Sequence, residues 1–470
     1  MTAKGIPRRV HLVGIGGIHM SAIAHVLLAW GHQVSGSDLK LSPLTERLQD
    51  QGATIREGHA ATHLGDAELV VYTAAARPDN PELTEAKRRG LPLLQRAEMI
   101  ARLLEGRQAI AVAGSHGKTT TTALIALMLQ EAGCDPTFLV GGEMIDLGTN
   151  AHAGRGEHIV VEADEFAGAF LHYRPQVAVV TNIEPDHLDF YGSFQRLTDA
   201  FRQFMSQVAA DGFLIACSDD PTVRNILAHP EAKPPIQASI IRYGLKKNAE
   251  FFPENLSPKG ICGYTFLLKY GEESYTAFET HLAGGHQVNN ALAAIVVARV
   301  LGLPKPAVRA ALARFRGVQR RFQLVGQAAD ITIMDDYAHH PTEISATVAA
   351  ARERFPGHRL VCLFQPHTYS RTRYLLDGFR TCFQGVDQLL IAETYAAREE
   401  PSAGMNAQEL VEAIDSPPAS YAGGLEEAPS KVVEALQPGD VFFTIGAGDI
   451  DEVGPQVLEA LRKGPWTASS

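Results

Sequence analysis

The sequence predicts an α/β protein of three domains, each built on a largely parallel sheet. Segments typical of strands and segments typical of helices alternate over most of the chain, which is the pattern of βαβ units. Polar clusters also follow several of the predicted strands. Open parallel sheets bind their ligands at the carboxyl ends of the strands, so these clusters are candidate binding sites.

Length and charge narrow the class of protein. The 470 residues exceed what one hydrophobic core supports, and two to four domains are expected. A content of 45% hydrophobic and 20% charged residues is typical of soluble globular proteins. The net charge is −11 and no block of basic residues occurs, so nucleic acid is not expected as a partner.

The cysteines and the apolar segments favour a cytoplasmic location. The five cysteines form no C-x-x-C pair, and an odd count suits a reducing compartment. The first residues lead into a short apolar run that glycines interrupt, which is unlike a signal peptide. The longest apolar stretches fall short of the roughly 20 residues that a membrane span needs, so we expect no membrane insertion.

The first domain opens with a strand over residues 9–14, a glycine-rich turn, a helix over 21–30 and a second strand ending at Asp38. This order is typical of a dinucleotide-binding βαβ unit, in which the terminal acid holds a ribose hydroxyl. His19 replaces the third glycine of the G-x-G-x-x-G pattern. The pattern therefore fits NAD, a nucleotide diphosphate, or a βαβ unit without a ligand.

A further strand at 68–73 and a helix at 81–89 continue this domain. His59 lies in the connection before that strand. It could meet a phosphate group, or it could be a solvated loop histidine.

The central domain begins with a phosphate-binding loop in residues 109–129, so we class it as P-loop ATPase-like. An apolar strand leads into Gly114-Ser-His-Gly-Lys118-Thr119, and a helix rich in alanine and leucine follows. Backbone N–H groups and the helix N-terminus would bind an anion there, Lys118 would reach the β- and γ-phosphates, and Thr119 would ligate Mg²⁺. Val112 stands where the standard pattern has its first glycine. We expect a nucleoside triphosphate site, the alternative being an ordinary strand–turn–helix joint with an exposed lysine.

Acidic residues follow the next two strands, as a magnesium site beside such a loop requires. The strand ending near residue 162 leads into Glu162-Ala-Asp-Glu165, and Glu162 is the first candidate ligand. The strand over 177–183 leads into Glu184-Pro-Asp186-His187-Leu-Asp189, which suggests a metal or phosphate site. His187 is a further candidate, although Mg²⁺ prefers oxygen ligands.

Residues 205–282 indicate β-rich segments in which no chemistry is apparent. A long helix then opens with His286 and Asn290 in its first turns. These side chains could contact an adenine, or they could simply cap the helix. We place the domain limits at 1–106, 107–313 and 314–470.

The last third predicts a Rossmann-like parallel sheet, with strands at 331–334, 360–364, 388–392 and 441–445. Three of these strands are followed by polar clusters. The clusters are Asp335-Asp-Tyr-Ala-His-His-Pro341, Gln365-Pro-His-Thr-Tyr-Ser-Arg-Thr-Arg373 and Gly446-Ala-Gly-Asp449.

Nine segments in order carry a family resemblance that spans residues 9 to 450. They are GIGGIHMSAIA, VSGSD, GSHGKTTTT, EADE, TNIEPDH, RRFQ, DDYAHHPTE, FQPHTYSRT and TIGAGDI. In these segments the chain resembles the Mur ligases of peptidoglycan synthesis, and among them the members that join L-alanine to UDP-N-acetylmuramate. The resemblance implies an ATP- and Mg²⁺-dependent ligase that forms an acyl phosphate, which the alanine amine then attacks.

The resemblance also implies roles for single residues, with the first domain holding UDP rather than NAD. The implied ATP contacts are Gly114, Ser115, His116, Gly117, Lys118, Thr119, Thr120, His286, Asn290, Arg321 and Asp336. The implied contacts of the UDP-sugar are Gly16, Gly17, His19, Met20, Ser21, Asp38, His59 and Thr73. The implied metal ligands are Thr119, Glu162 and His187, and the implied catalytic residues are Lys118, His187, His339 and Arg371, with Arg371 pairing the alanine carboxylate.

Four features of the sequence depart from the family pattern. No lysine occurs at 188–205, where several members carry a carbamylated one, so a second Mg²⁺ would need other ligands. Gln287 stands where many members have asparagine. Thr368 stands where some have a second arginine, whose part Arg373 could take. Phe166-Ala-Gly follows the EADE segment in place of Ser-Asp.

Three other functions compete with this interpretation. A recycling ligase would attach the tripeptide L-Ala-γ-D-Glu-meso-diaminopimelate to the same sugar nucleotide, and a non-catalytic sensor would only bind it. An NAD oxidoreductase would leave the central domain without a role. The sequence leaves open whether the protein is a monomer or a homodimer.

Overall fold

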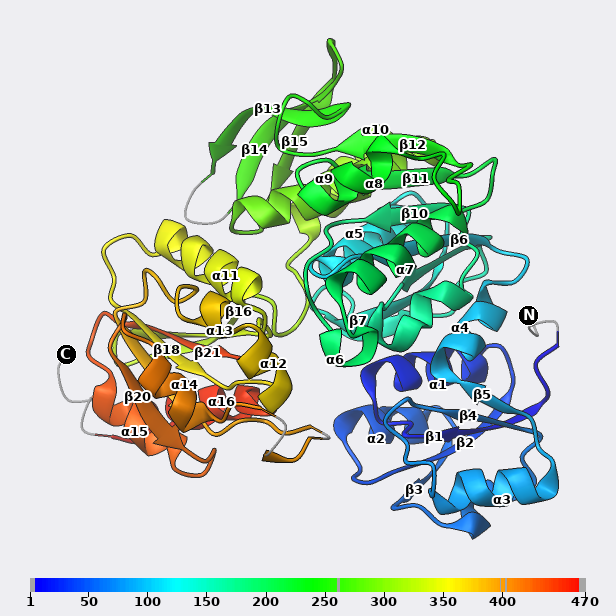
Figure 1. Cartoon of the computed structure of the whole chain (residues 1–470), viewed down its shortest axis with the longest axis horizontal. Helices are drawn as coiled ribbons and strands as arrows, with labels where there is room; N and C mark the ends of the chain where they lie inside the picture. The colour runs from blue at the N-terminus through cyan, green and yellow to red at the C-terminus, as the bar shows by residue number, and fades with distance from the viewer. Residues whose placement is uncertain (1–4, 260–262, 398, 402–403, 465–470) are drawn as a thin grey trace. The chain divides into compact units, whose positions relative to one another are not determined.

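The computed structural model describes residues 5–259, 263–397, 399–401 and 404–464. Three sheets with helices on their faces follow one another along the chain, so the predicted α/β class with parallel-rich sheets is confirmed (Figure 1).

The N-terminal sheet has five parallel strands in the order β3-β2-β1-β4-β5. Its strands are β1 (Arg9–Val13), β2 (Gln33–Asp38), β3 (Thr54–Glu57), β4 (Leu69–Tyr72) and β5 (Leu93–Gln95). Its helices are α1 (Ile18–Ala29), α2 (Pro43–Asp50), α3 (Pro81–Arg89) and α4 (Arg96–Leu104), with the 3-10 turn η1 (Ala61–Leu64). Helix α1 begins three residues earlier than the sequence predicts, directly after the glycine turn.

The central sheet has ten strands in the order β15-β14-β13-β12-β11-β10-β6-β9-β7-β8. They are β6 (Gln108–Ala113), β7 (Thr137–Met144), β8 (Thr149–His152), β9 (His158–Glu162), β10 (Val177–Val180), β11 (Phe213–Cys217), β12 (Ser239–Tyr243), β13 (Phe251–Pro258), β14 (Tyr264–Tyr270) and β15 (Glu273–Thr280). The accompanying helices are α5 (Lys118–Glu131), α6 (Leu188–Tyr191), α7 (Phe194–Ser206), α8 (Pro221–Ala228), α9 (Gly285–Val300) and α10 (Lys305–Arg314), with η2 (Phe166–His172). Strands β10, β6 and β9 are parallel neighbours, so the segments that follow them meet at one edge.

The C-terminal sheet has six strands in the order β16-β17-β21-β18-β19-β20. They are β16 (Gln323–Ala328), β17 (Ile331–Asp336), β18 (Leu360–Phe364), β19 (Gln388–Ala392), β20 (Ala419–Gly423) and β21 (Val441–Ile445). The helices are α11 (Pro341–Arg354), α12 (Tyr369–Tyr374), α13 (Leu376–Phe379), α14 (Ala407–Ala413), α15 (Ala428–Ala435) and α16 (Val453–Lys463), with η4 (Ile450–Glu452). The edge strand β16 is antiparallel to β17, which the sequence did not predict.

The chain divides into two compact units. One comprises residues 1–256, 266–280 and 289–316, and the other comprises 257–265, 281–288 and 317–470. The first two sheets lie in the same unit because they share one hydrophobic core. Helix α1 packs on β7 and β8 of the central sheet as well as on β2 of its own sheet. The predicted limits 1–106, 107–313 and 314–470 therefore stay predictions.

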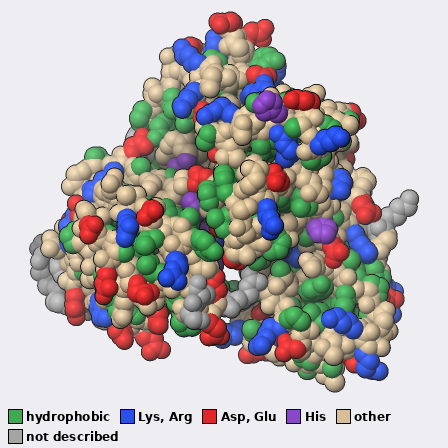
Figure 2. Space-filling model, in the orientation of Figure 1, with side chains coloured by type: hydrophobic (Ala, Val, Ile, Leu, Met, Phe, Trp, Pro, Cys, Tyr) green, Lys and Arg blue, Asp and Glu red, His purple; other side chains and the backbone are tan. Residues whose placement is uncertain are grey.

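Among the described residues, no helix has the length and apolar character to cross a membrane. On the face shown in Figure 2, basic and acidic side chains are interspersed.

Candidate active site

The phosphate-binding loop joins β6 to α5. At two of its positions the backbone conformation and the close neighbouring side chains leave room only for glycine. Gly114 has φ +137° and Gly117 has φ +82°, a region that side chains rarely adopt. A Cβ atom on Gly114 would lie 2.0 Å from Oγ1 of Thr181, and one on Gly117 would lie 2.3 Å from Oδ1 of Asn290. The loop is thus a close-fitting turn at a helix N-terminus, which is the geometry that binds phosphate.

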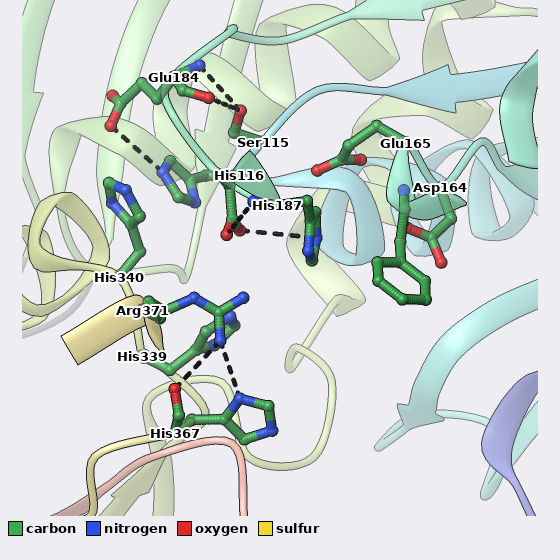
Figure 3. A network of polar contacts seen from close by, with 12 residues as sticks. Ser115, His116, Asp164, Glu165, Glu184, His187, His339, His340, His367 and Arg371 are labelled. Atoms are coloured by element: carbon green, nitrogen blue, oxygen red, sulfur yellow. Dashed lines mark hydrogen bonds and ion pairs between the residues drawn. The ribbon is translucent and has the colours of Figure 1, made fainter. Parts of the chain in front are cut away.

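The segment after β10 holds this loop in place. The hydroxyl of Thr181 donates to the carbonyl of His116 at 2.6 Å, and Oδ1 of Asn182 accepts from the N–H of His116 at 2.8 Å. The hydroxyl of Ser115 accepts from the N–H of Glu184 at 2.9 Å (Figure 3). Ser115 and His116, both predicted to contact ATP, are thereby fixed by the neighbouring strand end.

Lys118, the first residue of α5, is held by a carboxylate. Its Nζ lies 2.8 Å from Oε2 of Glu165 and donates to the carbonyls of Gly114 at 2.5 Å and Ser115 at 3.2 Å. Burial alone would lower the pKa of Lys118, but the nearby carboxylates of Glu165 and Asp164 raise it above its ordinary value. Lys118 is therefore a fixed positive charge in the loop.

Glu162 ends β9 and is also buried. Its Oε1 accepts from the N–H of Gly141 at 2.5 Å, and a Cβ on Gly141 would lie 2.6 Å from Oε2. Burial would raise the pKa of Glu162, but His19, the Gly141 N–H and Lys118 lower it below the ordinary value. Glu162 is a carboxylate, as the metal prediction requires.

A second group of possible metal ligands lies close to Lys118. Glu165, Asp186 and His187 each offer one ligand atom, and these atoms lie within 4.8 Å of one another. His187 has φ +52°, an unusual conformation for a residue with a side chain, and Oδ1 of Asp186 accepts from its N–H at 2.8 Å. The ring of Phe166 packs edge-on against the His187 imidazole, which gives this departure from the family pattern a structural role.

The remaining loop residues lie on α5. Thr119 is 8% exposed and Thr120 is 4% exposed, so both hydroxyls lie inside the loop region rather than on the surface. The donor set of the site is thus a threonine hydroxyl, several carboxylates and one imidazole. Oxygen-rich sets of this kind suit Mg²⁺.

The glycine turn of the first domain is fixed by Asp38. Its Oδ2 accepts from the N–H of Gly16 at 2.8 Å, and a Cβ on Gly16 would lie 2.9 Å from that oxygen. A Cβ on Gly14 would lie 2.6 Å from Cγ2 of Thr73, which places Thr73 against the same turn. Gly17 is the N-cap of α1.

The predicted sugar-nucleotide residues differ in how they could meet a ligand. Met20 and Ser21 are 2% and 3% exposed, so their side chains belong to the core and the turn of α1. The Ser21 hydroxyl donates to the carbonyl of Ile18 at 2.9 Å. His59 lies with Nδ1 2.9 Å from Oγ of Ser37.

In the second unit, Asp336 ends β17 and accepts two backbone N–H groups, from Phe322 and Ala338, both at 2.8 Å. Burial raises the pKa of Asp336 to about 6, against the opposing charge of Arg321. Arg321 pairs with Glu343 at 3.4 Å. The predicted nucleotide residues Arg321 and Asp336 are thus close neighbours.

The polar clusters after β17, β21 and β18 meet at one edge, because these strands are parallel neighbours. Nη1 of Arg371 donates to Nδ1 of His367 at 2.8 Å (Figure 3), and the rings of His339 and His367 lie 5.7 Å apart. Thr368, where some family members have arginine, is the N-cap of α12 and accepts from the Arg371 N–H at 3.4 Å. Arg373 is exposed.

His286 and Asn290 lie in the first turns of α9. The Asn290 amide lies against Gly117 of the phosphate loop, while Gln287 is 7% exposed. The structure therefore places Asn290 at the loop itself.

The sequence interpretation missed Arg96, Thr181 and Asn182 as residues of this site. It noted the carboxylates after β9 and β10 as groups but chose only Glu162 among them as a metal ligand. Thr181 and Asn182 lie directly after β10, so their polar side chains at a strand end were the available signal. Arg96 carried a different signal, since a cation at a helix N-terminus opposes the helix dipole.

These features define a class: a phosphate-loop enzyme of three α/β sheets, with a buried lysine and carboxylates at the loop. Three sequence profiles match consecutive parts of the chain. They are the Mur ligase family, catalytic domain (residues 9–108), the Mur ligase middle domain (112–298) and the Mur ligase, glutamate ligase domain (320–448). The chain belongs to the Mur ligase family.

Individual relatives are similar over nearly the full length. The UDP-N-acetylmuramate–L-alanine ligase of Anaeromyxobacter sp. (strain Fw109-5) is 44% identical over 97% of this chain and 98% of its own. The ligase of that name from Myxococcus xanthus (strain DK1622) is 45% identical over 97% and 96%.

Solved structures agree in fold. The UDP-N-acetylmuramate-alanine ligase of Thermotoga maritima has a TM-score of 0.81 at 29% identity, covering 97% of this chain and 99% of that one. A murein peptide ligase of Psychrobacter arcticus 273-4 has a TM-score of 0.74 at 26% identity, with the same coverage.

Proposed function

We propose that this chain is an ATP-dependent ligase that joins L-alanine to the lactyl carboxylate of UDP-N-acetylmuramate, in the synthesis of peptidoglycan precursors. The observation that carries the proposal is the 44–45% identity, over nearly the full length, to two ligases named for this reaction. The phosphate loop with Lys118, beside carboxylates on two neighbouring strand ends, supplies the chemistry that such a ligase needs.

In the first step, a lactyl carboxylate oxygen attacks the γ-phosphorus of ATP, an acyl phosphate forms, and ADP leaves. Two anions must approach each other, so positive charge at the reacting phosphate lowers the barrier. Lys118 supplies that charge from the first turn of α5, and the backbone N–H groups of the loop bind the remaining phosphate oxygens.

Magnesium fits the oxygen-rich set of Thr119, Glu162 and the group of Glu165, Asp186 and His187. When bound, it would neutralise phosphate charge. The absence of lysine at 188–205 leaves Glu165 and Asp186 as the carboxylates that could serve in its place.

The first domain holds the sugar nucleotide at the turn that Gly16 and Asp38 fix. Backbone N–H groups at the start of α1 bind its diphosphate. His19 follows this turn in the chain, and His59 contacts Ser37, which precedes Asp38 on β2. This assignment explains why the turn departs from the NAD pattern at His19.

In the second step, the alanine amine attacks the carbonyl carbon of the acyl phosphate, and inorganic phosphate leaves. Arg371 binds the alanine carboxylate, because a guanidinium pairs a carboxylate with two parallel hydrogen bonds. Its hydrogen bond to His367 fixes the guanidinium in place. His339, whose ring lies beside that of His367, is the candidate to contact the reacting groups.

Phosphate release from ATP and Mg²⁺ tests the proposal, measured with UDP-N-acetylmuramate and either L-alanine or the tripeptide L-Ala-γ-D-Glu-meso-diaminopimelate. Release with L-alanine supports it. Release only with the tripeptide would identify a recycling ligase instead. Tight binding of the sugar nucleotide without release in either case would identify a non-catalytic sensor.

A further inference from the structure

Arg96 occupies a position that local rules disfavour. It is the first residue of α4, where the positive end of the helix dipole repels a cation. Its side chain is only 17% exposed. A buried cation at a helix N-terminus is stable only when other groups compensate its charge. The contacts of Arg96 therefore indicate its role.

The Arg96 guanidinium contacts two residues that belong to different domains. Nη2 donates to Oδ2 of Asp164 at 2.7 Å, in the EADE segment of the central domain. Nη1 lies 3.0 Å from Nδ1 of His19, in the first turn of α1. The charge of Arg96 holds the pKa of Asp164 well below its ordinary range despite burial.

The hydrogen bond to His19 fixes the state of that imidazole. Every nitrogen of a guanidinium is a donor, so Nδ1 of His19 must accept and carries no proton. The ring is then the neutral tautomer with its proton on Nε2. That Nε2 is buried without a hydrogen-bond partner in the described structure, and it lies 3.8 Å from Oε2 of Glu162.

We propose that Arg96 is a positioning residue that holds His19 as the Nε2–H tautomer, so that its N–H points to the region between the sugar-nucleotide turn and Glu162. There the N–H meets an oxygen of the anionic sugar nucleotide. The proposal rests on the proposed function for the identity of that ligand. It does not rest on that function for the tautomer.

Lysine cannot replace arginine in this role. An ammonium group is a point charge and could keep the pair with Asp164, but it does not span two partners as the planar fork does. Glutamine can replace histidine at position 19. Its amide has one acceptor oxygen for Arg96 and one NH₂ group for the ligand, as the Nε2–H tautomer has.

The first experiment measures the tautomer directly. Imidazole nitrogen shifts of ¹⁵N-histidine-labelled protein distinguish a protonated from an unprotonated nitrogen, and the signal lost in His19→Gln identifies His19. We expect protonated Nε2 and unprotonated Nδ1 in the wild type, and a changed Nδ1 signal in Arg96→Lys. A proton on Nδ1 in the wild type would overturn the proposal.

The second experiment measures the affinity for UDP-N-acetylmuramate by calorimetry, without ATP or Mg²⁺. We expect Arg96→Lys and His19→Leu each to weaken binding about tenfold, as the loss of one hydrogen bond does. His19→Gln should remain within about threefold of wild type. The double variant Arg96→Lys/His19→Leu should bind no worse than His19→Leu, because Arg96 acts through His19.

Two controls separate the possible failures. Arg102→Lys, on the same helix, should bind as wild type does, and thermal melting shows that each variant is folded. Additive losses in the double variant, or a loss in His19→Gln as large as in His19→Leu, would overturn the positioning role. A wild type that binds no UDP-N-acetylmuramate would contradict the proposed function, while the tautomer measurement would still decide the role of Arg96.

Discussion

Nζ of Lys118 lies 2.8 Å from Oε2 of Glu165, and both side chains are largely buried, at 16% and 1% exposure. Glu165 lies three residues after Glu162, the carboxylate that the sequence analysis predicts as a metal ligand. The phosphate-loop lysine is thus oriented by the same acidic segment that supplies Glu162. The position of Lys118 and the predicted metal site therefore both depend on the short segment 162–165.

Replacing Glu165 by glutamine should destabilise the fold by about 3 kcal/mol, because it leaves the buried charge of Lys118 unpaired. Urea unfolding at pH 7.5 measures this change. The double variant Glu165→Gln/Lys118→Met should recover most of the lost stability, since it removes both charges. An unchanged midpoint in Glu165→Gln would show that the carbonyls of Gly114 and Ser115 suffice to hold the ammonium.

Lys118→Ala should lower the rate of phosphate release with L-alanine by about a thousandfold or more, because it removes the charge nearest the reacting phosphate. Lys87→Ala, an exposed lysine on α3, is the matched control and should retain wild-type turnover. A loss below tenfold in Lys118→Ala would contradict the assigned role.

Gly117→Ala should cost more stability than Gly133→Ala, although both glycines have similar backbone angles, φ +82° and +75°. Alanine at 133 would meet no atom within 4 Å, so only the strain of about 1 kcal/mol applies. Alanine at 117 would also collide with Asn290, which adds about 1–3 kcal/mol. Equal thermal shifts in the two variants would show that the loop relaxes freely.

Glu82 should give the fold an acid-sensitive contribution. Its buried carboxylate accepts from Ser37 at 2.6 Å and lies within 3.5 Å of His11, His59 and His63. Burial would raise the pKa of Glu82, but these hydrogen bonds and charges bring it below 4.5.

A carboxyl whose pKa is lowered by folding stabilises the folded state when the pH lies above 4.5, the pKa of this group in the unfolded chain. This stabilisation is lost as the pH falls through the pKa of the folded state. Glu82→Gln should therefore unfold about 1–3 kcal/mol more easily at pH 7, with the difference from wild type shrinking below pH 4.5. Denaturant titrations at several pH values measure it. Glu434→Gln, an exposed position, should follow the wild type at every pH.

The sequence alone predicted the three-sheet α/β fold because strand–turn–helix patterns are local. The glycine-rich turns at Gly16 and Gly117 and the acids after the strands at 162 and 186 were evident for the same reason. Each of these features lies within a dozen residues of its strand, so periodicity and turn chemistry suffice to locate it.

Contacts between distant segments could not be predicted in this way. The pairing of Arg96 with Asp164 joins residues 68 positions apart, and nothing in either segment names its partner. The antiparallel edge strand β16 is likewise decided by its pairing with β17 rather than by its own pattern. The sequence showed that Thr368 stands where some family members have arginine. Its role as the N-cap of α12 could not be predicted, because it depends on the backbone conformation at that turn.

Helix α1 is apolar on nearly every side and lies between its own sheet and strands β7 and β8. A chimera that exchanged only the first hundred residues with those of a distant relative would bring a new α1 to an old β7–β8 surface. Such grafts should express as aggregates unless that surface is exchanged too. In recombination, and in the design of minimal fragments, the first two sheets must therefore be exchanged or kept together.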